Sequence, residues 1–268
     1  MRNMKITTYI SVAFLVVVVA AQPAAAQPTA EEIVARSLKT FYYAGGDQRA
    51  RVSMRMINAR GKERLREMTL LRKNLGSGGE QRYYIYFHKP VDVKGTAFMV
   101  WKYPAREDDR WIFIPAIKLV RRIAADDKRS SFVGSDFTYE DVSGRPVEDE
   151  SHSLLGEETL EGRPVYRIES VPKAKVGYVR RFSWIDRERG LPLKEKYYDV
   201  RGALLRTFTA NEVREVNGHW TVTRRTMRDA QSGHRTEVAY EKVEYDVGLT
   251  EDLFSERYLR RPSKRWVR

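Results

Sequence analysis

The chain has 268 residues, of which 42% are hydrophobic and 32% charged, and its formal net charge is +13. This length is enough to bury a sizeable core, and one large domain is preferred over two small ones. The absence of cysteine excludes disulfides and a lipid-modified cysteine at an export site.

The first 26 residues have the pattern of a signal peptide. Arg2 and Lys5 precede an apolar run over 10–21, and Ala24, Ala25 and Ala26 follow it. A membrane anchor is the alternative, but the run is short for a span of about 20 residues. We therefore expect export to the periplasm, with 1–26 removed, 27–268 forming a single domain, and a remaining charge of +11.

One amphipathic helix is predicted at the start of the exported part. Thr29 and Glu32 form a capping box, and Val34, Leu38, Phe41 and Tyr42 recur at helical spacing before Gly45 and Gly46. Its apolar stripe either packs on a core or covers the mouth of a cavity, and the sequence favours neither interpretation.

From Ala50 onward, residues alternate between apolar and polar, which predicts strands. Strands are expected from residue 50 to a turn at 58–61, then over 62–73, 82–88 and 96–103. The segment 110–142 then predicts two short strands, a basic turn and a looped or helical stretch at the mouth of a concave wall. Its first strand, with Trp111 and Phe113, contains few polar residues, so we expect it to be covered on both faces or to line an apolar hollow.

Seven further strands are predicted after Gly144, over 151–160, 165–171, 178–186, 193–199, 204–215, 219–228 and 235–246. Turn dipeptides separate them, and Asn217-Gly218 is the strongest two-residue hairpin signal. A last helix is expected over 250–258, capped by Thr250, before a loosely held basic tail at 260–268.

Consecutive hairpins without intervening helices predict a mainly β fold. We expect one strongly curved antiparallel sheet that closes partly or wholly around its concave face, as in a half-open β-barrel.

The sequence lacks a recognisable catalytic or metal-binding motif. His88, His152, His219 and His234 are scattered, and neither a metal site nor a cofactor is expected. Gly134-Ser135-Asp136 lacks the flanking pattern of a nucleophile elbow, so a hydrolase is a minor alternative, because triads are recognised by geometry. Basic pairs such as Arg121-Arg122 could suggest nucleic acid, but export favours anionic lipid head groups or an acidic transporter surface instead.

The region 87–142 carries a longer pattern. It includes FHKP at 87–90, KGTAF at 94–98, Trp101 and the run WIFIPAIKLVRRI…SSFVGSDFTYEDV. This pattern resembles the signature of the LolA-like family of periplasmic outer-membrane lipoprotein-sorting proteins, and the likeness extends over the whole exported part. The resemblance implies a half-open barrel with a few helices covering its concave side.

The resemblance also implies a function. We expect a monomeric, non-enzymatic periplasmic carrier that holds the acyl chains of a lipoprotein or lipid and meets membrane surfaces transiently. An inner-membrane transporter and an outer-membrane acceptor are the expected partners, and a non-carrier accessory subunit of an envelope transporter is the alternative. The residues expected to line the cavity are Leu38, Phe41, Phe87, Met99, Trp101, Trp111, Phe113, Phe132, Phe137 and Trp184.

Overall fold

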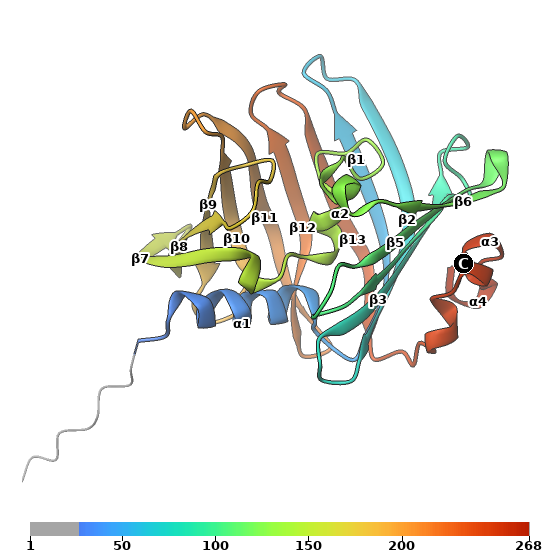
Figure 1. Cartoon of the computed structure of the whole chain (residues 1–268), viewed down its shortest axis with the longest axis horizontal. Helices are drawn as coiled ribbons and strands as arrows, with labels where there is room; N and C mark the ends of the chain where they lie inside the picture. The colour runs from blue at the N-terminus through green and yellow to red at the C-terminus, as the bar shows by residue number, and fades with distance from the viewer. Residues whose placement is uncertain (1–26, 268) are drawn as a thin grey trace, which may run out of the picture.

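A computed structural model describes residues 27–267, and the expected signal peptide at 1–26 lies outside the described residues. One antiparallel sheet of thirteen strands dominates this part (Figure 1). All thirteen strands predicted from the alternation are present, which confirms a mainly β fold. Their bounds are β1 (Asp47–Ile57), β2 (Glu63–Leu75), β3 (Glu80–Lys89), β4 (Ala97–Lys102), β5 (Asp109–Ile114), β6 (Leu119–Ile123), β7 (Glu150–Leu160), β8 (Arg163–Pro172), β9 (Arg180–Asp186), β10 (Pro192–Tyr198), β11 (Leu204–Val216), β12 (His219–Asp229) and β13 (Arg235–Tyr245).

The sheet curves but does not close. Its spatial order runs from β6 through β1, then β13, and on to β7, so β6 and β7 are the two free edges. Within each half, neighbouring strands are joined by hairpins, and β1 pairs with β13 to unite the halves. At the β11–β12 turn, Asn217 and Gly218 have φ of 49° and 77°, the positive values that such a two-residue turn requires. The half-open barrel is therefore confirmed.

Helix α1 (Ala30–Tyr42) begins at the predicted capping box, in which Thr29 and Glu32 bond reciprocally. It lies across one rim of the sheet (Figure 1). Ile33 and Val34 pack on Tyr166, Ile168 and Ile185 of the second half of the sheet.

The chain between the two edge strands crosses the concave face (Figure 1). We call residues 124–149 the cover segment. It holds η2 (Ala125–Arg129), α2 (Tyr139–Ser143) and η3 (Val147–Asp149), and a short turn, η1 (Pro115–Ile117), precedes β6. Because β6 and β7 lie at opposite edges, the connection has to span the hollow of the sheet.

The expectation for the C-terminus is wrong. Instead of one helix over 250–258, the structure has η4 (Glu251–Leu253), α3 (Glu256–Arg260) and α4 (Lys264–Val267), and the Thr250 side chain caps none of them. The basic tail is also held, because Leu259 and Val267 are buried against the outer face of β3–β5. That face is apolar and needs a cover, which the C-terminal segment supplies. Among residues 27–267, none of the helices is long and apolar enough to cross a membrane.

Candidate functional site

The concave face has an apolar half, formed mainly by β1–β5 with β12 and β13. Its buried side chains include Met54, Met56, Ile85, Phe87, Phe98, Val100, Ile112 and Met227. Three rings of the cover segment fill this half: Phe132, Phe137 and Tyr139, each at most 8% exposed. The Phe132 and Tyr139 rings lie 5.4 and 5.2 Å from the ring of Phe98. The hollow of the sheet is thus occupied by the protein's own aromatic side chains.

Polar contacts fasten the middle of the cover segment to the sheet. The Asp136 carboxylate lies 2.7 Å from Nδ1 of His234 and accepts a 2.7 Å hydrogen bond from the Thr236 hydroxyl. The backbone N–H of Asp136 donates to the same hydroxyl at 3.0 Å. These partners lie about 100 positions away in sequence, on the β12–β13 hairpin.

A second fastening joins the start of α2 to β11. Both carboxylate oxygens of Asp141 accept from Arg206, at 2.6 and 3.1 Å, and Asp141 also closes a capping box with Thr138. Burial alone would raise the pKa of Asp141, but Arg206 and Thr138 lower it below the usual range. Such a largely buried pair is costly to break, because removing one partner leaves the other charge unpaired.

The other half of the concave face is polar. Arg181 donates to Glu150 and, at 2.7 Å, to Glu195, while the Tyr178 hydroxyl donates to Glu150 at 2.6 Å. Burial alone would raise the pKa of Glu150, but Arg181 and Tyr178 lower it. A cavity of ≈70 Å³ lies between this cluster and α1. It is far smaller than the roughly 300 Å³ of ordinary ligand pockets.

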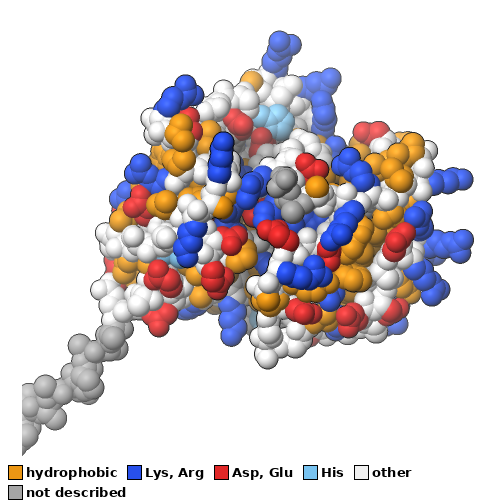
Figure 2. Space-filling model, viewed as in Figure 1, with side chains coloured by type: hydrophobic (Ala, Val, Ile, Leu, Met, Phe, Trp, Pro, Cys, Tyr) orange, Lys and Arg blue, Asp and Glu red, His pale blue; other side chains and the backbone are white. Residues whose placement is uncertain are grey.

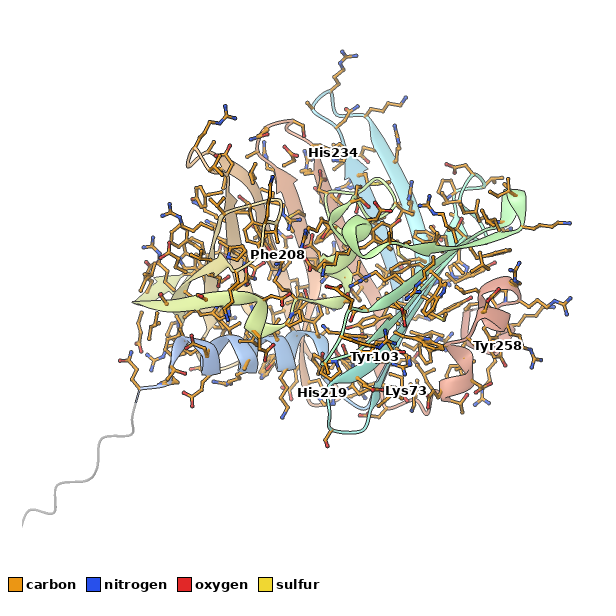
Figure 3. All side chains as sticks on the ribbon, viewed as in Figure 1. Lys73, Tyr103, Phe208, His219, His234 and Tyr258 are labelled. Atoms are coloured by element: carbon orange, nitrogen blue, oxygen red, sulfur yellow. The ribbon has the colours of Figure 1, made fainter. Side chains whose placement is uncertain are left out.

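Helix α1 joins the two halves. The Phe41 ring lies 6.1 Å from that of Phe208, on the concave side of β11 (Figure 3). The Tyr42 ring packs on Gly144 at the end of α2, where a Cβ would approach it to 2.9 Å, so only glycine fits. Helix α1 therefore both packs on the core and lies over the concave face, the two interpretations that the sequence left open.

Five of the ten residues expected to line a cavity lie on the concave side. Phe87, Phe132 and Phe137 belong to its apolar cluster, and Phe41 packs against that cluster. Leu38 packs beside the polar half, where it borders the small cavity.

The other five lie on the outer face, so they do not share a hollow with Phe87. Met99, Trp101, Trp111 and Phe113 pack against the C-terminal segment, and Nε1 of Trp101 donates to the Phe254 carbonyl at 2.8 Å. Trp184 lies outside on β9, where its Nε1 donates to Glu158 and Arg167 approaches its ring.

On β4 and β5 the residues that face the hollow are Phe98, Val100 and Ile112, the immediate neighbours of the residues expected there. Register could have revealed this, because Phe98 pairs with Ile85, and Ile85 shares a strand face with Phe87. The first strand of the central segment is covered on both faces, as its composition predicts: Ile112 faces the hollow and Phe113 faces the C-terminal segment.

The Ser135 hydroxyl and the His234 ring, two groups that could take part in hydrolysis, make structural contacts instead. The Ser135 hydroxyl is buried and donates to the Phe132 carbonyl at 2.8 Å, and the ring of His234 bonds Asp136 rather than a serine. In the described part of the chain, no group of three or more histidine, aspartate or glutamate side chains could hold a metal ion.

Comparisons with known proteins identify solved structures that share this architecture. A family model described as "Uncharacterized protein" matches residues 79–261, and no curated protein matches the sequence. A structure from Vibrio parahaemolyticus, named for an outer membrane lipoprotein-sorting protein domain, is 31% identical with a TM-score of 0.80, over 87% of this chain and 98% of that chain. A DUF1329 family protein from Desulfovibrio piger is 29% identical with a TM-score of 0.80, over 86% of this chain and 97% of that one.

A more distant likeness concerns the fold alone. A LolA superfamily protein from Nitrosomonas europaea is 21% identical with a TM-score of 0.68, over 87% of this chain and all of that one. The resemblance noticed in the region 87–142 therefore extends to the architecture, and this chain belongs to the LolA-like family of outer-membrane lipoprotein-sorting proteins.

Proposed function

We propose that the protein is a periplasmic carrier that binds the acyl chains of a lipoprotein or lipid on the apolar half of its concave face. The observation that carries this proposal is the filling of that half by Phe132, Phe137 and Tyr139. These rings belong to a connection between strands and not to the sheet, so they can leave while the sheet keeps its hydrogen bonds. An acyl chain would then take their place.

The burial terms alone favour this exchange. Burying a phenylalanine-sized side chain contributes about 1.5–3 kcal/mol, so withdrawing three rings costs roughly 5–9 kcal/mol. An acyl chain of about 16 carbons gains roughly 13 kcal/mol at about 0.8 kcal/mol for each buried CH₂. The polar fastenings at Asp136 and Asp141, together with the lost freedom of the cargo, oppose the exchange and keep the empty protein closed.

The binding needs no reaction chemistry and no cofactor, because burial alone supplies affinity. The names of the similar structures support a role in lipoprotein sorting, and a role in lipid export is equally compatible with the apolar face. Export by the expected signal peptide would bring the protein to the periplasm, between a transporter in the inner membrane and an acceptor in the outer membrane. A monomer is sufficient, because the concave face is built by one chain.

The test is to purify the protein from the periplasm, extract it with organic solvent and identify bound lipids by mass spectrometry. The delipidated protein is then titrated with a fluorescent fatty-acyl probe. We expect acyl lipid in the extract, and probe binding that saturates at one binding site per chain. An extract without lipid, together with no probe binding, would favour the accessory subunit, in which the same face holds a segment of a partner protein.

A further inference from the structure

The two rims of the curved sheet differ in the chemistry of their turns. We call the upper rim the one formed by the turns 58–62, 90–96, 115–118, 173–179, 199–203 and 230–234. The lower rim holds α1 and the turns 76–79, 103–108, 161–162, 187–191 and 217–218. In Figure 3, His234 marks the upper rim, and His219 and Tyr103 mark the lower one.

Exposed apolar side chains gather on the upper rim. The three most exposed large hydrophobic residues described are Val91 (89%), Val200 (83%) and Ile117 (64%), each in a different turn of this rim. Leu65, Leu119, Val171 and Val179 lie close to the same strand ends, and Leu155, in the middle of β7, is the exception. The Val91 and Ile117 turns are neighbours, because a Cβ on Gly95 would lie 3.5 Å from Pro115.

Positive charge gathers on the same rim. Its turns contain seven lysine or arginine residues and two aspartates, whereas the lower turns contain three basic and four acidic residues. Within residues 27–267, Lys94 and Lys118 form no ion pair, and both are exposed beside the apolar turn tips. Figure 2 shows lysine and arginine side chains projecting from the top of the molecule.

We propose that the upper rim docks on the surface of an anionic phospholipid bilayer. Aliphatic side chains at turn tips can enter the interface between head groups and acyl chains, and neighbouring lysines gain from the negative surface potential. The apolar tips are spread over separate turns along a rim and do not form one contiguous patch, which suits an extended lipid surface better than a protein epitope.

The docking would bring the cover segment to the membrane. The fastening of Asp136 to His234 lies at the upper rim, since His234 ends the β12–β13 turn (Figure 3). A cargo chain leaving the concave face there would have only the interface to cross. This use in transfer rests on the proposed carrier function, whereas the docking itself does not.

The test is flotation of the delipidated full chain with vesicles of phosphatidylcholine alone, or of phosphatidylcholine mixed with an equal amount of phosphatidylglycerol. We expect binding to the anionic vesicles that weakens as salt increases, and little binding to the neutral ones. Lys94→Gln with Lys118→Gln should weaken binding about 25-fold, at about fivefold for each charge lost. Val91→Asp with Ile117→Asp should abolish it.

Two matched controls use the same chemistry away from the rim. Leu155→Asp removes the exposed hydrophobic residue on β7, and Lys242→Gln removes an exposed lysine near the lower end of β13. Both should bind vesicles like the wild type. The proposal is wrong if the wild type does not bind anionic vesicles, or if the folded rim variants bind these vesicles as well as the control variants do. Vesicle binding without acyl-probe binding would refute the carrier and leave the docking intact.

Discussion

If the cover segment occupies the place of cargo, then weakening it should lower stability and raise affinity. Phe132 is 4% exposed, and its ring lies 6.2 Å from that of Phe87 on β3. Phe132→Ala should therefore cost about 3–5 kcal/mol of unfolding free energy, the usual range for a buried phenylalanine. It should also remove about 1.5–3 kcal/mol from the cost of opening, which would tighten binding of an acyl probe by roughly 10- to 150-fold.

Phe87→Ala is the matched control, because Phe87 lies on the wall side of the same contact and is fully buried. It should lose a similar 3–5 kcal/mol of stability, and its affinity should fall or stay unchanged, since the ring belongs to the binding face. The assay is probe titration of delipidated protein beside chemical denaturation in the same buffer. If folded Phe132→Ala, or the milder Phe132→Leu, binds no tighter than the wild type, the cover segment does not compete with cargo.

Three more predictions concern the fastenings and the outer face. The chain lacks cysteine, so the double variant Asp136→Cys with Thr236→Cys can form a single disulfide that locks the cover segment. Probe binding should vanish when this disulfide is oxidised and return when it is reduced. Thr236→Cys alone is the control. Equal binding in both redox states would count against opening of the cover segment at Asp136. Asp141→Asn should cost about 3–5 kcal/mol at neutral pH. Folding lowers the pKa of Asp141, so the stability lost in Asp141→Asn should shrink as the pH falls through 3.8, the usual pKa of an aspartate, and below. A stability difference that stays constant over a series of acid pH values would contradict this. Trp101→Ala should cost about 3–5 kcal/mol without changing probe affinity of the folded fraction, because Trp101 packs outside, and an affinity loss would argue against that assignment.

The fold followed closely from local sequence signals. Period-2 alternation and turn dipeptides such as Asn217-Gly218 act over a few residues, so each strand and hairpin could be predicted without knowing the rest of the chain. The capping box at Thr29 fixed the start of α1 for the same reason. A run of hairpins leaves one meandering antiparallel sheet as the simplest architecture, and the structure has it.

The sidedness of the sheet, by contrast, was decided only by the tertiary structure. β4 and β5 are apolar on both faces, so composition could not show that Phe98 faces the hollow while Trp101 and Trp111 face α3 and α4. That assignment depends on the C-terminal segment, which folds back over the outer face from more than 100 positions away and whose helices are too short to be secured by their own sequence.

The filling of the hollow has the same origin. Asp136 with His234, and Asp141 with Arg206, are joined across 98 and 65 positions, and nothing local in either segment specifies such a pairing. The sequence by itself determined the strands, the turns and the family pattern, because these depend on neighbouring residues. Only the folded chain decided which face is covered by which segment, because that choice depends on how the whole sheet curves and where its two edges end.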